Sequence, residues 1–317
     1  MLNRIIAPLL TIILAVAAEF CLATPGPIIL SGSGPGPKTI EDHAMATSQV
    51  ITDSLDYAAN TIDITLAGKK YTKKANESSL TVSQYLTSIE GGIVKTSTDF
   101  GLNLRLPNLE RRWQLRFTSY DVEEENRDVS QQRVRTRPRP REYGASLLFF
   151  EKLGNVKTTF QPRLQLKDPL DMSYVLRFES TAVHKGVRLL PRLDLFADAR
   201  KGTGEFVSLD LLLELSKHSD LTFQNTEEYK NLENSFTTQH GISYDYSLTD
   251  QKALGASYTV VSANHNFHLA SSTAALIFTE QIYRRLLKYS LTPFLAFGKS
   301  EHFKGKAGIT LNIDVVF

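Results

Sequence analysis

The chain has 317 residues, of which 42% are hydrophobic and 22% are charged, and its formal net charge at pH 7 is +2. Proteins that bind nucleic acid are usually markedly basic, so this charge gives no electrostatic case for nucleic acid as a partner. The length is sufficient for one or two domains.

The first 23 residues have the pattern of a secretory signal peptide. Arg4 precedes an apolar run over residues 5–18, and small residues surround Ala23. This run is shorter than the roughly 20 apolar residues of a spanning helix, so we expect cleavage after Ala23; a short uncleaved anchor is the alternative. A bulky residue before Cys21 argues against a lipid-modified cysteine. Since Cys21 is the only cysteine, the exported chain would have no disulfide and would depend on a large core or an extensive backbone hydrogen-bond ladder.

Residues 24–75 are predicted to form a periplasmic linker and one short amphipathic helix. The segment 24–45 is rich in Pro, Gly and Ser, as flexible linkers are. Apolar residues then recur at helical spacing over about 47–64, namely Ile51, Leu55, Ala58 and Ile62. We expect this helix to pack on its own protein, because helices gain most of their stability in that way. Contact with a partner is the alternative.

From about residue 76 to residue 317, apolar and polar residues alternate with the period of two that is typical of β-strands. Short segments with turn residues separate the alternating runs. A membrane strand with its connection takes roughly 17 residues, which predicts about 14 strands, with 12 as the alternative. The expected strands are 76–89, 93–106, 110–120, 141–152, 155–167, 171–182, 187–198, 204–215, 218–230, 234–247, 250–263, 267–284, 286–298 and 304–317.

The residue types on the two faces favour lipid on the outside. The apolar face consists of Leu, Phe and Tyr, and the polar face of Gly, Ser, Thr, Asn and charged residues. Trp113, Tyr289 and Phe317 lie at strand ends, where membrane barrels carry aromatic girdles. The predicted fold class is therefore all-β, an antiparallel transmembrane β-barrel over residues 76–317 preceded by the short N-terminal amphipathic helix. A soluble sandwich or propeller is the alternative fold.

Four features carry a resemblance to a known family: the signal-peptide pattern, the cysteine-free exported chain, the succession of hairpins and the last strand GITLNIDVVF, which ends in Phe317. In these features the chain resembles Gram-negative outer-membrane β-barrel proteins of the porin-like kind. No subfamily of known function is matched. In such proteins the last strand and its terminal aromatic residue are recognised by the barrel assembly machinery, so the resemblance implies that Phe317 is an assembly signal. It also implies residence in the outer membrane, with both termini in the periplasm and with outer-membrane lipid and lipopolysaccharide around the barrel.

Charges on the inward positions are segregated along the chain. The early strands form a basic wall of Arg105, Arg112, Arg116, Lys157, Arg163, Arg177 and Arg192. The later positions form an acidic wall of Glu179, Asp194, Asp198, Asp210, Glu214, Glu228, Asp245 and Asp314. Unpaired charges in a dry interior are very costly, so the lumen is either water-filled, with a transverse field, or closed by ion pairs. The sequence leaves both possibilities open.

The longest predicted connection, residues 121–141, is acidic in its first half and then carries an arginine at every second position: Arg133, Arg135, Arg137, Arg139 and Arg141. With a periplasmic N-terminus this loop would lie outside the cell. Guanidinium groups at this spacing suit bidentate contacts with phosphates of lipopolysaccharide or with an anionic solute. The alternative is a solvated loop whose two halves neutralise each other.

The residue patterns do not indicate an enzyme. The exported chain has no G-x-S-x-G motif and no cysteine for a thiol nucleophile, and the pair His265 and His268 is more typical of a polar turn than of a metal site. We expect no catalytic residue, metal or cofactor. The leading functional hypothesis is a channel for small polar or charged solutes. The second is an occluded scaffold barrel that anchors periplasmic or surface protein partners, and the third is an outer-membrane lipid hydrolase.

Overall fold

The computed structural model describes residues 40–67, 78–106, 113–264, 268–282 and 286–317. The predicted signal peptide, most of the predicted linker, Arg112 and His265 lie outside the described residues.

Helix α2 (Ile40–Ala67) is longer at both ends than the helix predicted from the sequence. Its fully buried residues recur at every fourth position, in a stripe of Ile51, Leu55, Ala59 and Asp63. The predicted apolar stripe shares the first two of these residues, whereas Ala58 and Ile62 are only half-buried. Among the helices described, none is both long enough and apolar enough to cross a membrane.

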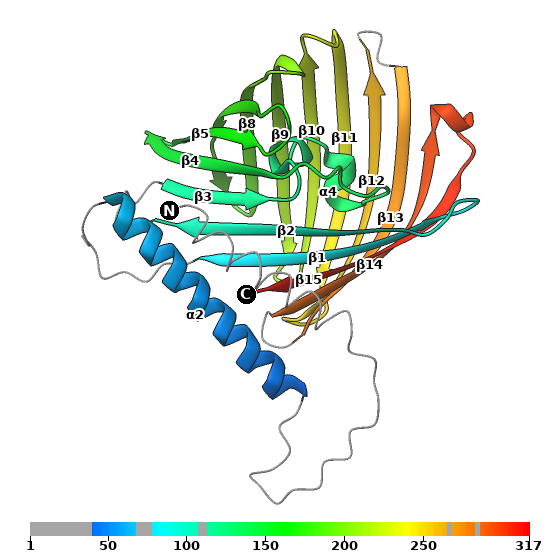
Figure 1. The fold of residues 1–317 in the computed structure, drawn as a ribbon. Helices are drawn as coiled ribbons and strands as arrows, with labels where there is room; N and C mark the ends of the chain where they lie inside the picture. Colours follow the sequence, from blue (N-terminus) through cyan, green and yellow to red (C-terminus); the bar gives the residue numbers. More distant parts are fainter. Residues whose placement is uncertain (1–39, 68–77, 107–112, 265–267, 283–285) are drawn as a thin grey trace, which may run out of the picture. The chain divides into compact units, whose positions relative to one another are not determined.

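Fourteen antiparallel strands form one closed barrel, which confirms the predicted fold class and strand number (Figure 1). They are β1 (Ser79–Ile89), β2 (Lys95–Arg105), β3 (Trp113–Thr118), β4 (Gly144–Leu153), β5 (Val156–Gln165), β6 (Asp171–Glu179), β8 (Val187–Asp198), β9 (Gly202–Ser216), β10 (Ser219–Lys230), β11 (Ser235–Ser247), β12 (Lys252–Ala263), β13 (His268–Ile282), β14 (Leu287–Gly298) and β15 (Lys306–Val316). A short strand, β7 (Ala182–His184), pairs with the start of β8.

The barrel closes by pairing β6 with β8 and β1 with β15. At the second seam the N–H of Phe317 donates to the carbonyl of Leu80 at 2.8 Å, and the N–H of Leu80 donates to the carbonyl of Phe317 at 3.1 Å. The first strand therefore begins where the last strand ends. Closure pairs the backbone groups that an open sheet edge would leave free, which is a requirement for a sheet in lipid.

The two faces of the barrel wall have opposite polarity. Large apolar side chains stay exposed on the outward positions of the strands, among them Phe160, Tyr174, Leu195, Leu209, Ile242, Tyr258, Leu276, Leu295 and Ile309. Polar side chains are buried on the inward positions, among them Ser97, Asp99, Ser146, Gln161, Asp194, Thr226, Ser243 and Thr310. A soluble monomer rarely exposes an apolar surface of this extent, whereas a lipid-facing band consists of one. The alternative fold considered from the sequence, a soluble sandwich or propeller, is therefore wrong.

A small apolar cluster inside the barrel depends on a glycine. Val175, Phe196 and Phe206 pack together on inward positions of β6, β8 and β9. The Phe196 ring lies over Gly204, where an added Cβ would be 2.3 Å from the ring and 2.4 Å from the carbonyl oxygen of Tyr229. A side chain at position 204 would therefore displace the ring.

We expect Gly204→Ala to reduce the free energy of unfolding by about 1 to 3 kcal/mol, the usual cost of overpacking. The thermal midpoint of the refolded barrel, followed by circular dichroism, measures the loss. Gly101→Ala is the control, because a Cβ at inward-facing Gly101 would meet only Thr118 Cγ2, at 3.9 Å. Equal midpoints for the two variants would show that the close approach of Phe196 is unimportant.

Candidate functional site

The connection between β3 and β4, residues 119–143, folds into the barrel, and we call it the inserted loop. It contains two short helices, α3 (Val122–Glu125) and α4 (Val129–Arg133). The Asp121 side chain accepts hydrogen bonds from the N–H groups at the start of α3, and the Asp128 side chain accepts one at the start of α4. Helix α4 contacts β11 and β12, beside which it lies in Figure 1.

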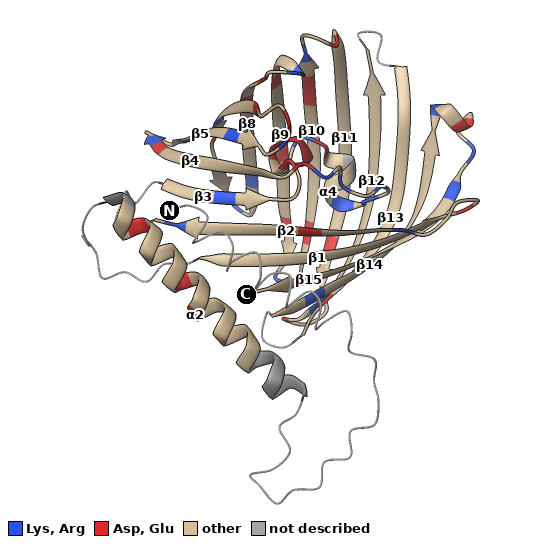
Figure 2. Cartoon of the chain, viewed as in Figure 1, with Lys and Arg blue, Asp and Glu red and all other residues tan. Residues whose placement is uncertain are grey.

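The loop leaves the wall at the end of the barrel opposite the start of β1, and its insertion into the lumen was not predicted from the sequence. A highly charged segment is expected in solvent when only its own sequence is considered. In the structure each half of the loop instead meets side chains of opposite charge on the barrel wall. Figure 2 shows charged residues along the inserted loop and on the strands around it, while β12 and β13 carry few.

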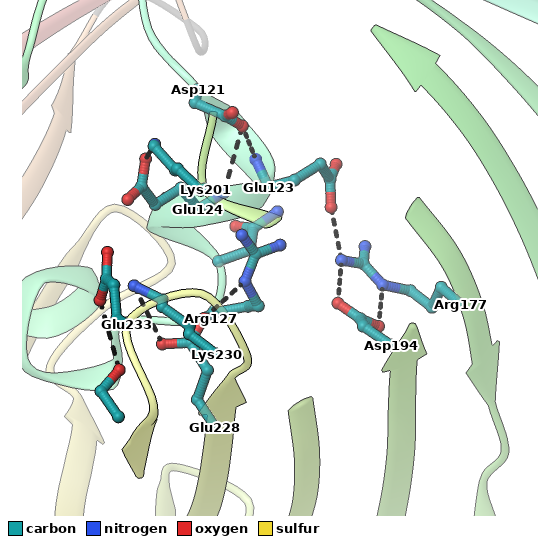
Figure 3. A network of polar contacts seen from close by, with 12 residues as sticks. Asp121, Glu123, Glu124, Arg127, Arg177, Asp194, Lys201, Glu228, Lys230 and Glu233 are labelled. Atoms are coloured by element: carbon teal, nitrogen blue, oxygen red, sulfur yellow. Dashed lines mark hydrogen bonds and ion pairs between the residues drawn. The ribbon is translucent and has the colours of Figure 1, made fainter. Parts of the chain in front are cut away.

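The acidic half of the loop lies against the basic wall. Glu123, only 4% exposed, forms an ion pair with Arg177 and a second with Arg116 at 3.5 Å. Arg177 also donates from Nε and Nη2 to the two carboxylate oxygens of Asp194, each at 2.8 Å, and therefore joins the loop to the wall (Figure 3). Asp194 is fully buried and accepts a further hydrogen bond from Arg192 Nε at 2.9 Å.

A second contact of this kind involves the turn between β8 and β9. The ammonium group of Lys201 lies 2.5 Å from Glu124 (Figure 3). Burial lowers the pKa of Lys201, but its hydrogen bond and attraction to Glu124 outweigh burial and hold the pKa above its ordinary value. The lysine is therefore charged at neutral pH and fixes the first turn of α3.

The arginines of the loop lie against carboxylates of the wall. Arg127 Nε is 3.0 Å from Glu228, and Arg133 Nη1 contacts both carboxylate oxygens of Asp245, at 2.7 and 2.9 Å. Arg139 Nη1 is 3.2 Å from Asp99 on β2. Acidic loop residues thus meet basic wall residues and basic loop residues meet acidic wall residues, which explains why so charged a segment is stable inside the barrel.

The middle of the loop is held by contacts within it. Glu125 accepts hydrogen bonds from Arg135 and from Arg139, the latter from Nε at 2.5 Å and from Nη2 at 2.8 Å. The Arg139 guanidinium also lies 3.8 Å from the centre of the Tyr120 ring and 4.8 Å from that of the Tyr85 ring. This part of the loop neutralises itself, as in the alternative considered from the sequence.

The far side of the loop reaches the strands at the closure of the barrel. Val134 packs with Ala275 on β13 and Phe294 on β14. The hydroxyl of Thr310 on β15 donates to the carbonyl of Arg135 at 2.7 Å. Together with the contacts on β2, β6 and β10 to β12, these interactions show that the loop crosses the whole interior.

Two neighbouring cavities that share lining residues lie beside the loop, and together we call them the vestibule. The first has a volume of about 640 Å³ and the second about 500 Å³, and Asn126, Lys157 and Glu179 line both. The first is also lined by Asn155, from the turn between β4 and β5. Since successive strands alternate in direction, this turn lies at the end of the barrel where β1 begins. The vestibule therefore opens at the end of the barrel where β1 begins and β15 ends.

The charges that line the vestibule are unequal in number. The cationic side chains are Arg105, Arg116, Lys152, Lys157, Arg177 and Arg192, and the anionic ones are Glu123, Glu179 and Asp210. A third cavity, of about 280 Å³, is lined by Asp99, Arg116 and Tyr120. The lumen is thus narrowed by the loop but is not solidly packed.

The strand register places all described residues of the two predicted walls on inward positions. They do not face one another as two bare surfaces, because the loop lies between them. Other pairs form along the wall, between Lys157 and Glu179 at 3.2 Å and between Arg188 and Glu214 at 3.0 Å. Asp314 accepts a hydrogen bond from Ser83 at 2.6 Å.

The structure changes the roles of the predicted loop arginines. Arg133, Arg135 and Arg139 bind carboxylates of their own chain. The Arg137 side chain is 71% exposed, and its contact with Asp128 is longer, at 3.5 Å. Arg141 is exposed. Binding of an anionic ligand by this loop stays a prediction. Of the five arginines, Arg137 and Arg141 are exposed and would make the contacts with such a ligand.

Asp99, Arg127 and Lys201 are among the residues of this network that were missed from the sequence. Asp99 had a usable signal, since it alternates with Ser97 and Gly101 as inward residues do. The other two belong to a loop and a turn, where no alternation indicates direction. Their partners became apparent only from the fold.

The part of the chain that the structure describes offers little support for a metal site. One group of potential ligands occurs there, formed by Asp121, Glu124 and Glu142. Lys201 binds the second of these carboxylates, and Asp121 caps α3. These carboxylates therefore hold the loop in place, and their charge is partly neutralised by Lys201.

No family model and no curated protein matches the chain. Among solved structures, a loop-deletion mutant of OmpT, an outer-membrane protein of Vibrio cholerae, is 8% identical, with 77% of this chain and 99% of that chain covered and a TM-score of 0.48. The outer-membrane channel DcaP of Acinetobacter baumannii is 8% identical, covering 77% and 97%, with a TM-score of 0.48. OccK11 of Pseudomonas aeruginosa is 10% identical, covering 76% and 96%, with a TM-score of 0.45. At these values the similarity concerns the outer-membrane barrel fold alone.

Proposed function

We propose that this chain is an outer-membrane channel for small polar or charged solutes and that the inserted loop is its constriction. The observation that carries the proposal is the charged vestibule inside a barrel whose outward face is apolar. A wet, charged lumen inside a lipid-exposed wall is the arrangement of membrane pores. Barrels with wide channels typically have 16 to 18 strands, so a 14-stranded barrel containing a loop is expected to pass only small solutes.

The membrane orientation and the partners are part of this proposal. We expect the end where β1 begins and β15 ends, and with it the vestibule, to face the periplasm. Phe317 would act as the signal for the barrel assembly machinery, and lipopolysaccharide would surround the opposite end of the barrel. Periplasmic protein partners stay a hypothesis for which the described residues offer no separate support.

A second candidate function is an occluded scaffold barrel. The contacts of Glu125 with Arg135 and Arg139 favour it, because they place a neutralised cluster in the middle of the lumen. A barrel closed in this way would anchor protein partners without conducting ions.

Planar-bilayer recording of the refolded barrel separates the two candidates. A channel gives steady, ion-selective current steps after insertion. Insertion without current, shown by protease protection of the same preparation in vesicles, would reject the channel and favour the scaffold.

Selectivity should depend on Arg116. This residue lines two of the cavities and is 21% exposed in its side chain, so Arg116→Gln removes a charge that permeating ions can sense. We expect the permeability ratio of cations to anions to increase roughly twofold, measured as a shift in reversal potential under a KCl gradient.

Arg163→Gln provides the comparison. Both Arg116 and Arg163 are expected from the sequence to line the pore, but the structure shows Arg163 to be only 3% exposed and to donate to Thr118 Oγ1 and to the carbonyl of Glu142. We expect this variant to unfold more easily without a change in reversal potential. An unchanged reversal potential in Arg116→Gln would remove that residue from the ion pathway.

A further inference from the structure

One carboxylate of the vestibule lacks a cation of its own. Asp210, on an inward position of β9, lines the first cavity and accepts a hydrogen bond from the backbone of Asn225, while its Oδ1 is buried without a hydrogen-bond partner among the described residues. Arg192 lines the same cavity and attracts Asp210 electrostatically, but its hydrogen bonds go to Asp194, through two nitrogens, and to the carbonyl of Asn126 at 3.2 Å. Buried polar atoms are nearly always paired, so an unpaired carboxylate oxygen beside a cavity indicates a missing donor.

The neighbours of Asp210 suit an ammonium group. Ser208, Gln224 and Thr226 line the same cavity and supply oxygen atoms that accept hydrogen bonds. An ammonium group has three donors and no acceptor, so one carboxylate together with neutral oxygen acceptors satisfies it. On the inward face, Gln224 of β10 pairs with Asp210 of β9, and Thr226 pairs with Ser208. These four polar residues are therefore direct neighbours, with no apolar residue between them.

The second cavity has the opposite charge. Arg105, Arg116, Lys157 and Arg177 line it, against the carboxylates of Glu123 and Glu179. Guanidinium and ammonium groups in excess of carboxylates attract an anion, and the planar fork of arginine matches a carboxylate. Asn126, Lys157 and Glu179 line both cavities, so the acidic and the basic cavity are neighbours, as a solute with two opposite charges requires.

We propose that the vestibule binds small zwitterionic solutes, with the ammonium group at Asp210 and the carboxylate group at Arg116 and Lys157. The proposal rests on the proposed channel function and names its substrate class. Each cavity is within the range of about 300 to 1,000 Å³ that is usual for small-molecule sites. A simple anion would leave Oδ1 of Asp210 without a donor and would be repelled by the Asp210 carboxylate. A simple amine would be repelled by the excess of cationic side chains.

Isothermal titration calorimetry on the refolded barrel in detergent tests the site without requiring conductance. Glycylglycine is the zwitterionic probe, and acetate and methylammonium each supply one of its charges. We expect glycylglycine to bind at least about tenfold more tightly than either single ion, which corresponds to about 1.4 kcal/mol. Asp210→Asn should weaken glycylglycine binding about tenfold and leave acetate binding unchanged or tighter.

Asp220→Asn is the matched control. Asp220 is also half-buried and on an inward position, but on β10 and away from the vestibule lining. We expect it to bind glycylglycine like the unmodified chain. The unheated barrel's mobility on a denaturing gel verifies that each variant is folded.

The outcomes separate the site from the channel. Equal binding of acetate and glycylglycine, or unchanged binding in Asp210→Asn, would overturn the zwitterion site. Saturable binding that depends on Asp210, in a barrel that carries no current, would support the site and reject the channel. In a conducting barrel, we expect glycylglycine to reduce the current of the unmodified chain more than that of Asp210→Asn.

Discussion

Replacement of residues 122–140 by a short Gly-Ser connection is expected to raise the single-channel conductance of the barrel about threefold or more. The inserted loop contacts the wall from β2 to β15 and fills the middle of the lumen with the cluster around Glu125. Its removal leaves a continuous cylinder that water can fill. Wall residues such as Glu228 and Asp245 then lose their arginine partners, but hydration replaces the lost ion pairs.

Shortening the connection between β14 and β15 is the matched control. Residues 299–305 lie at the same end of the barrel, are exposed and connect two strands, as the inserted loop does. Their removal should leave the conductance unchanged, because none of them contacts the inserted loop among the interactions described. Equal conductance of the loop-deleted and the unmodified barrel would show that the inserted loop is not the constriction.

The strands could be predicted from the sequence because alternation is a local signal. Each lipid-facing residue is followed by a lumen-facing one, and the two environments select different residue types. The strand predicted over 187–198 has those bounds in the structure. The strand predicted over 110–120 ends two residues earlier, at Thr118, because the chain leaves the wall there to enter the barrel. Alternation cannot indicate where a strand gives way to such a loop.

The position of the inserted loop could not be predicted in the same way. Its charges are compatible with water and with a charged wall, and its partners lie far away in the sequence; Arg127 and Glu228 are 101 residues apart. The order of charges nevertheless contained information, since an acidic-then-basic loop is complementary to a basic-then-acidic series of strands. A comparison of those two series would have suggested insertion.

The contacts that a side chain makes within one face of the barrel wall also could not be predicted from the sequence. Arg116 and Arg163 both occupy inward positions, but the first reaches the cavities and the second turns to Thr118 and to the backbone of Glu142. Periodicity gives the face of a residue, whereas the neighbours on that face determine its contacts. The two predicted walls therefore combine residues that border open space with residues that hold the loop.

Asp194→Asn is expected to have the largest effect on stability of any single substitution in the network. The carboxylate is fully buried and accepts hydrogen bonds from both Arg177 and Arg192. The amide keeps the shape but loses the charge and one acceptor, so two buried guanidinium groups lose their shared counterion. Removal of one member of a buried ion pair typically costs about 3 to 5 kcal/mol. Urea unfolding in lipid vesicles, followed by the fluorescence of Trp113, measures the change.

Glu214→Gln is the control, because Glu214 also pairs with a wall arginine, Arg188, but both side chains are nearly half exposed. Exposed pairs contribute about 0 to 1 kcal/mol, so this variant should unfold almost like the unmodified barrel. Adding Arg192→Gln to Asp194→Asn should recover part of the loss, since only Arg177 then remains buried, and Glu123 still neutralises it. If Asp194→Asn unfolds at the same urea concentration as Glu214→Gln, the guanidinium groups have access to water and the cluster does not anchor the loop.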